Sequence, residues 1–84
     1  MPYDETELAV YFDELGDCIM EAAQVHPDWS QYTYAEMANL CMEELGEIAR
    51  ALNDNADTSE ILTEVSHLAV TAARMYIEIA RRQE

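Results

Sequence analysis

Three glutamates, Glu43, Glu44 and Glu47, lie in "CMEELGEIARAL" (residues 41–52), where most of the other residues are apolar. At about 100° per residue, the apolar positions predict one inner helix face. That face comprises Met37, Cys41, Leu45, Ile48 and Leu52. Glu44 falls beside this face and Glu47 lies one turn further on, whereas Glu43 lies more towards solvent. A partly buried carboxylate without a partner costs several kcal/mol, so the pattern predicts a bound cation.

The later segment "EVSH" provides a counterpart, because Glu64 and His67 are three residues apart on one flank of a helix. If the two helices pack antiparallel across the turn "NDNAD", Glu44, Glu47, Glu64 and His67 converge. Carboxylate oxygens with one imidazole nitrogen form a site for a hard divalent cation. The simpler alternative for Glu47 is an ion pair with Arg50, three residues further on. Glu44 has no basic residue at i±3 or i±4.

Three helices are expected around these residues. The first begins near Asp4, with Glu7 three residues on as in a capping box, and ends near Val25 before "HPDW". The second opens with Thr33 and Glu36 and runs to about Leu52. The third follows Asp57 and Glu60 and runs from about Thr58 to Arg82. The first helix carries an apolar stripe that comprises Leu8, Tyr11, Phe12, Leu15, Ile19, Ala22 and Ala23.

The composition also predicts an all-α fold, with a core that is shared between subunits. Half of the 84 residues are hydrophobic, yet only two are Gly and two are Pro. A chain this short buries only about 60% of its unfolded surface, so a lone monomer is marginally stable. The third helix is apolar on two sides, with Leu62, Val65 and Tyr76 on one and Val70 and Ile77 on the other. Two apolar sides require two neighbours, which are either a third helix of the same chain or another subunit, and the small size favours the subunit.

The charge balance excludes several partners. Four basic residues against eighteen acidic ones give a net charge of −14, which repels nucleic-acid phosphates.

The N-terminus lacks a basic leader, and no apolar run approaches the roughly 18 residues of a membrane span. Cys18 and Cys41 lie within helical patterns rather than a disulfide framework. We therefore expect a cytoplasmic protein with reduced thiols.

Taken together, "EELGE" at 43–47 and "EVSH" at 64–67 resemble the EExxE…ExxD signature of MazG-like nucleoside triphosphate pyrophosphohydrolases. The stretch "HPDWSQYTYAEMANLCMEELGEIARALND" is also similar to that family. The resemblance implies a single MazG-like domain over residues 1–84. It further implies a helical bundle assembled as a homodimer or a dimer of dimers, and hydrolysis of a nucleoside triphosphate to monophosphate and pyrophosphate.

The resemblance also assigns roles to the motif residues. Glu44, Glu47 and Glu64 match ligands of Mg²⁺, and Glu43 matches an additional glutamate that assists a ligand or a water. The sequence departs from the family at His67, where the pattern has an aspartate. Imidazole binds Mn²⁺ better than Mg²⁺, so this departure predicts a changed metal preference, loss of one of two ions, or loss of activity.

Two further residues are candidates for substrate binding. Arg74 lies two turns after His67 and can contact phosphate, although an ion pair with Glu78 is as simple. Trp29 can stack on a nucleobase or pack against the bundle. Two other functions remain open: an inactive, acidic binding or regulatory member of the same fold, and a di-iron or di-manganese bundle built on Glu-x-x-His.

Overall fold

The computed structural model describes residues 2–83, and these residues form three α-helices and no strand. Helix α1 spans Glu5–Val25, α2 spans Tyr34–Asn53 and α3 spans Thr58–Arg82. The predicted all-α class and the three helices are confirmed. Each helix boundary lies within about one residue of the position that the capping signals predicted.

The helices begin where side chains satisfy their first free amides. Asp4 and Asp57 each accept a hydrogen bond from the amide three residues on, at 2.7 and 2.8 Å. Thr33 and Glu36 form a complete capping box, in which each side chain accepts the other's backbone N–H at 3.0 Å. The hydrogen bond from the Thr33 amide holds the pKa of Glu36 below its usual value. Local chemistry therefore fixes the three start points.

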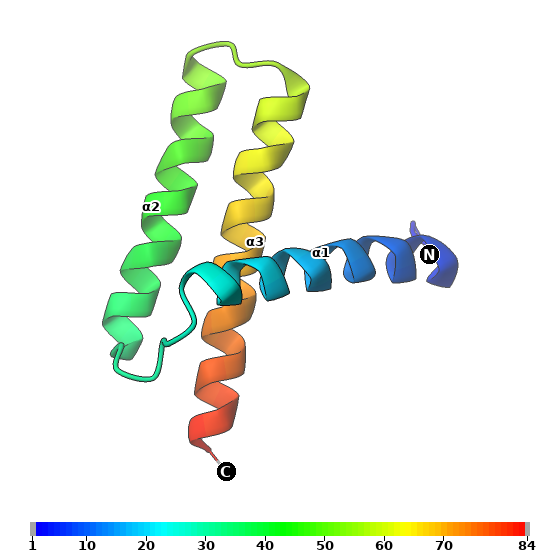
Figure 1. Ribbon diagram of the computed structural model, residues 1–84. Coiled ribbons are helices and arrows are strands. Elements are labelled where there is room, and N and C mark those ends of the chain that lie inside the picture. The colour runs from blue at the N-terminus through cyan, green and yellow to red at the C-terminus, as the bar shows by residue number, and fades with distance from the viewer. Residues whose placement is uncertain (1, 84) are drawn as a thin grey trace.

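Helices α2 and α3 run antiparallel and form a hairpin (Figure 1). The turn between them is tight because Asn55 adopts a left-handed conformation, with φ of 56°, which asparagine tolerates better than most residues. The amide of Ala56 then donates to the carbonyl of Ala51 at 2.9 Å, which closes the end of α2. This turn sets α2 and α3 side by side along most of their length.

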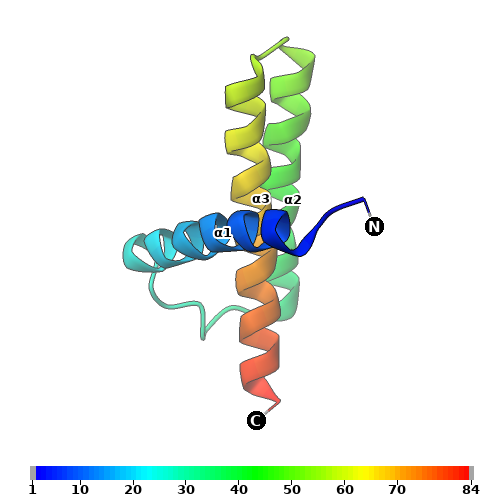
Figure 2. The same cartoon turned by 90° about the vertical axis from the view of Figure 1, so that its right-hand side faces the viewer.

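Helix α1 crosses α3 at a steep angle, and its N-terminal half extends away from the hairpin (Figures 1 and 2). The predicted apolar stripe of α1 is therefore buried only in part. Tyr11 and Phe12 are 61% and 64% exposed, so α2 and α3 leave most of their surface uncovered. The physical reason is the crossing angle, since a helix that crosses another steeply covers it over only a few turns.

Most of the core lies where the hairpin meets α1 and the connection before α2, whereas Ala51 is buried near the turn between α2 and α3. Its buried hydrophobic side chains are Trp29, Met37, Ala51 and Val70. Leu45 and Leu52 of the predicted inner face are each 56% exposed, so this part of the face is not buried within the single chain. The apolar arc of α2 is wider than the single neighbour α3 can cover.

The chain exposes more surface than a compact globular protein of its mass. Its accessible surface is 6509 Å², whereas a compact monomer of 9.6 kDa exposes about 5,100 Å², so the excess is roughly 1,400 Å². The radius of gyration is 14.3 Å, against about 12 Å for a compact domain of this length. Across residues 2–83, no helix combines the length and apolar character needed to cross a membrane.

A buried arginine joins α1 to α3. Arg74 is 9% exposed, and its guanidinium donates to the carbonyls of Ala22 and His26 at 3.4 and 2.6 Å. The same group lies 4.4 Å from the ring centroid of Trp29. Burial lowers the pKa of Arg74 from its usual value, while the nearby Glu78 opposes this shift. The contacts hold the C-terminal end of α1 and the following connection on α3.

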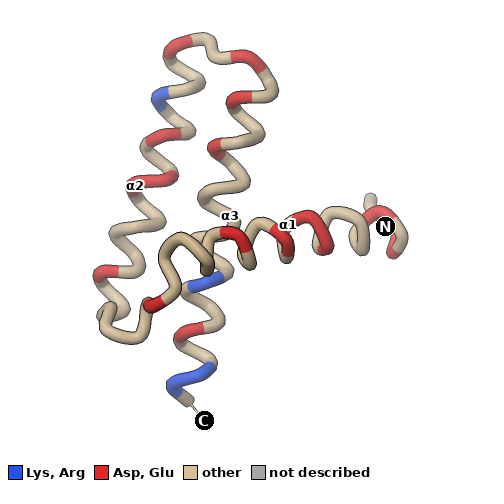
Figure 3. The backbone as a smooth tube through the Cα atoms, in the orientation of Figure 1, with Lys and Arg blue, Asp and Glu red and all other residues tan. Residues whose placement is uncertain are grey.

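A second arginine holds the other end of that connection. Arg82 donates to the carbonyls of Trp29 and Ser30, each at 3.3 Å, and its guanidinium lies 5.4 Å from the ring centroid of Tyr34. Three of the four basic residues therefore lie in the C-terminal half of α3, whereas acidic positions are spread over all three helices (Figure 3).

Replacement of Arg74 is expected to destabilise the protein strongly. Arg74→Met keeps much of the side-chain volume but removes two hydrogen bonds from a charged group and the contact with Trp29. We expect a loss of about 2 to 4 kcal/mol in the free energy of unfolding, measured by urea denaturation.

The matched control is Arg81→Met, because Arg81 is 71% exposed and pairs with Glu78 at 3.6 Å. Its cost is expected to stay within about 0.5 kcal/mol. Equal unfolding midpoints for the two variants would show that Arg74 does not hold α1 in place.

Candidate metal centre

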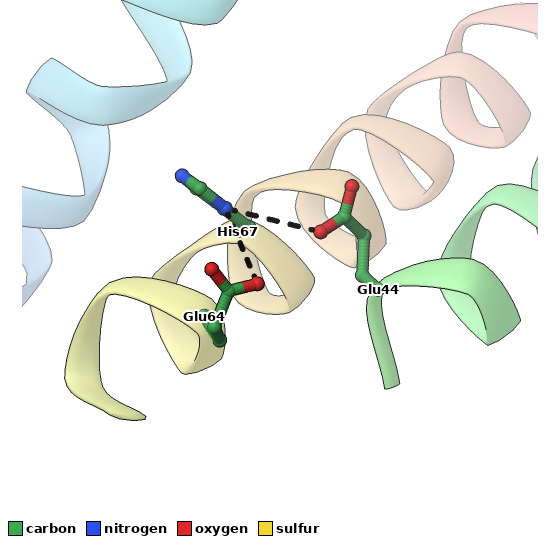
Figure 4. A group of neighbouring side chains, drawn as sticks. All are labelled: Glu44, Glu64 and His67. Atoms are coloured by element: carbon green, nitrogen blue, oxygen red, sulfur yellow. Dashed lines mark ion pairs between the residues drawn. The ribbon is translucent and has the colours of Figure 1, made fainter. Parts of the chain in front are cut away.

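Glu44, Glu64 and His67 converge between α2 and α3 (Figure 4). Glu44 lies in the middle of α2, on the same side of the helix as the buried Met37 two turns earlier. Glu64 and His67 lie one turn apart on α3, so both project towards the same flank. One donor atom from each residue lies within 4.8 Å of the other two. The antiparallel hairpin thus brings together three of the four predicted ligands.

The distances in this cluster suit a shared cation better than a direct hydrogen bond. His67 Nδ1 lies 3.9 Å from an oxygen of Glu44 and 3.9 Å from an oxygen of Glu64. That separation is too long for a hydrogen bond. Two donors that are each about 2.1 Å from one ion lie roughly 3 to 4.2 Å apart, so the two separations from His67 fit a common ion.

Partial burial strengthens the repulsion between the two carboxylates of the cluster. The side chains of Glu44 and Glu64 are 31% and 22% exposed, whereas His67 is 54% exposed. Two carboxylates that are close together in a partly desolvated place repel each other, and a cation between them relieves this repulsion. Figure 4 shows the second ring nitrogen of His67 pointing away from both carboxylates. The cluster therefore offers two oxygen donors and one nitrogen donor from a single protomer.

Glu47 lies beside this cluster but is engaged elsewhere. Both of its carboxylate oxygens accept hydrogen bonds from Arg50 at 2.9 Å. The structure therefore shows the ion pair with Arg50 that was the simpler alternative for Glu47. Glu47 and Glu64 line a common small cavity of ≈ 120 Å³. Glu47 can therefore approach the cluster by releasing Arg50. Its role as a metal ligand stays a prediction, as does the assisting role of Glu43, whose side chain is exposed.

The two predicted substrate-binding residues contact each other. Trp29 is 7% exposed, with its ring edge-on to Tyr32 and its face towards the guanidinium of Arg74. Both line a cavity of ≈ 270 Å³ that also reaches Glu44. Phosphate could contact Arg74 only if the hydrogen bonds to the carbonyls of Ala22 and His26 were given up. Substrate contact by Trp29 and Arg74 stays a prediction.

A second cavity, of ≈ 320 Å³, lies between α1 and the hairpin and reaches Glu44 and His67. It is also lined by Cys18 and Glu21 of α1 and by Thr71 of α3. Sequence patterns alone did not link α1 with the candidate ligands, because the way in which two helices cross depends on residues far apart in the chain. Thr71 was also missed, although its position four residues after His67 places both on one flank.

Searches of protein-family models, of curated proteins and of solved structures found no match to this chain.

Loss of Arg50 is expected to improve metal binding. Arg50→Gln removes the positive group that neutralises Glu47 and frees its carboxylate beside Glu64. The pair is largely exposed and therefore worth about 0.2 to 1 kcal/mol, so we expect Mn²⁺ affinity to rise roughly 1.5- to 5-fold. Titration of the electron paramagnetic resonance signal of free Mn²⁺ measures this change.

The matched control for this titration is Arg81→Gln, since Arg81 is equally exposed but lies at the far end of α3. An unchanged Mn²⁺ affinity in Arg50→Gln, or an equal gain in Arg81→Gln, would mean that Glu47 takes no part in the site.

Proposed function

We propose that this protein is a metal-dependent hydrolase of nucleoside triphosphates that acts in the cytoplasm and yields a monophosphate and pyrophosphate. The observation that carries the proposal is the convergence of Glu44, Glu64 and His67 from two helices. These residues belong to the two segments that resemble the MazG-like signature, so the same residues support the site by geometry and by sequence pattern. The proposed ion is Mg²⁺, with Mn²⁺ as the alternative that His67 favours.

Each side chain of the cluster would have its own role in holding the ion. Glu44 and Glu64 supply the anionic oxygens that hold a divalent ion, and His67 supplies the third donor. A divalent ion in such a site neutralises phosphate oxygens and lowers the pKa of a coordinated water. Glu47 can add a fourth donor on release from Arg50, and Glu43 is positioned next to Glu44 along α2.

The two cavities that reach Glu44 provide space for the substrate. One extends towards Trp29 and Tyr32, whose rings supply an apolar wall for a base, and the other extends between α1 and α3. A net charge of −14 repels a free triphosphate. Its complex with a divalent ion is less negative, and the positive charge of the ion dominates close to the site.

A second candidate is a catalytically inactive protein of the same fold that binds a basic partner. The pairing of Glu47 with Arg50 favours it, because that pair leaves fewer free carboxylates at the centre than the motif contains. The engagement of Arg74 with backbone carbonyls favours it too, since a phosphate would have to compete for this guanidinium. Assays of activity separate the two candidates.

We also propose that the working form is a homodimer or a dimer of dimers. The roughly 1,400 Å² of surface beyond that of a compact monomer supports this assembly.

Removal of one carboxylate is expected to abolish hydrolysis. Glu44→Gln keeps the size of the side chain but removes the central negative charge, so pyrophosphate release should fall by at least about 100-fold. The assay measures pyrophosphate from a panel of nucleoside triphosphates with Mg²⁺ and, separately, with Mn²⁺. Glu14→Gln is the matched control, because Glu14 is exposed in the projecting half of α1.

Hydrolysis that persists in Glu44→Gln would exclude this carboxylate from the reaction. If the wild-type protein is folded and releases no pyrophosphate with either ion, the inactive candidate is favoured.

Replacement of the histidine tests the choice of metal. His67→Asp replaces a nitrogen donor with an oxygen donor, so the ratio of Mg²⁺ to Mn²⁺ affinity should rise about 10-fold. Isothermal titration of each ion measures the ratio without any assay of activity. An unchanged ratio would show that His67 does not bind the metal.

A further inference from the structure

The crossing of α1 over α3 leaves one cavity on each side of the contact between the two helices. The cavity of ≈ 320 Å³ that reaches His67 is lined by residues of α3 that precede Arg74. A further cavity, of ≈ 230 Å³, lies on the side of the crossing towards the C-terminus of α3. It is lined by residues in the ranges 19–23 of α1 and 74–81 of α3, and we name it the C-terminal cavity.

Three charged residues form one wall of the C-terminal cavity. Arg74, Glu78 and Arg81 follow one another at intervals of four and three residues, so they form a single stripe along α3. The side chain of Glu78 is 17% exposed, and its oxygen lies 3.6 Å from Arg81, which is too long for a hydrogen bond. The helix dipole adds partial negative charge here, but Arg82 in the same last turn also offsets it. The stripe therefore carries one positive charge in excess.

This charge balance sets the C-terminal cavity apart within an acidic protein. The chain has four basic residues against eighteen acidic ones. Each of the three cavities described above is lined by at least as many acidic as basic residues, whereas the C-terminal cavity is lined by two arginines and one glutamate. Figure 3 shows that basic positions gather in this half of α3. A small anion is therefore attracted to this cavity, although the protein as a whole repels it.

The opposite wall of the cavity is apolar. It comprises Ile19, Met20 and Ala23 of α1, Pro27 of the connection and Ile77 of α3. Met20 and Ile77 are 65% and 36% exposed, so an apolar group that covers them gains free energy from their burial. A cavity of about 150 Å³ can hold benzene, so ≈ 230 Å³ has space for one ring and a short chain. The cavity therefore matches a ligand with an apolar body and one anionic end.

We propose that the C-terminal cavity binds a small organic acid, whose carboxylate contacts Arg81 and Arg74 and whose apolar body lies between α1 and α3. The exposed guanidinium of Arg81 can pair with a carboxylate through two parallel hydrogen bonds. Arg74 has five N–H donors and gives two of them to the carbonyls of Ala22 and His26, so it can contact the acid and keep both bonds. A doubly charged phosphate fits less well, because Glu78 lies in the same stripe and the excess is a single charge.

The test is a titration of ¹⁵N-labelled protein with 3-phenylpropionate, followed by nuclear magnetic resonance and without added metal. This probe has a ring, a two-carbon chain and one carboxylate. Amide shifts should be largest in residues 19–23 and 74–81, with a dissociation constant on the order of 1 mM for a ligand of about eleven heavy atoms. The uncharged 3-phenylpropanamide has the same shape and should bind at least about 5-fold more weakly.

Two arginine variants show whether the carboxylate binds where we propose. Arg81 and Arg50 are matched, because each pairs with a glutamate three residues earlier and their side chains are 71% and 67% exposed. Arg81→Gln should weaken binding of 3-phenylpropionate about 5-fold or more and leave binding of the amide unchanged, whereas Arg50→Gln should change neither. Glu78→Gln should strengthen binding of the acid about 2- to 5-fold, because it removes the competing carboxylate.

Several results would overturn the proposal. They are the lack of any shift with 3-phenylpropionate at about 20 mM, equal affinities for the acid and the amide, and equal effects of Arg81→Gln and Arg50→Gln. Inorganic phosphate is a further probe, and binding as tight as that of 3-phenylpropionate would show that the apolar wall takes no part. None of these measurements depends on metal binding or hydrolysis, so they stand or fall separately from the proposed function.

Discussion

The arrangement of the three helices depends on one buried cation, the guanidinium of Arg74. The carbonyl of His26, just after α1, accepts a hydrogen bond from Arg74, and the same guanidinium adds a longer one to the carbonyl of Ala22, which already accepts the His26 amide. The guanidinium also lies against the buried ring of Trp29 in the connection. The cavities beside the metal centre exist because α1 is held in this position.

The hairpin separates two kinds of surface on its two sides. The side towards α1 carries the carboxylates of Glu44, Glu47 and Glu64, where a cation and its ligands can be partly desolvated. Leu45, Leu62 and Tyr76 on the other side are exposed. A chain of 84 residues buries only a small core, so both sides of this two-helix unit stay partly uncovered.

The sequence was sufficient for features that depend on neighbouring residues. Thr33 and Glu36 fixed the start of α2, and the spacing of Glu64 and His67 was enough to place both on one flank. Features that depend on the crossing of helices were not predictable. Neighbouring residues give no information on how steeply α1 crosses α3, so the exposure of Phe12 could not be predicted. The apolar residues of α2 cover a wide arc, and the sequence does not tell which part of that arc α3 covers, so the exposure of Leu45 could not be predicted either.

The steep crossing of α1 divides that helix into two parts with different dynamics. Its C-terminal part is held by Arg74, whereas nearly all side chains of residues 5–14 are exposed and the helix there relies on its own backbone hydrogen bonds and the Asp4 cap. Amide protons in an isolated helical turn exchange with solvent through fraying, and amides under tertiary contacts exchange only through larger openings. Within a protomer, protection against hydrogen exchange should therefore fall along α1 from its C-terminal end towards its N-terminal end.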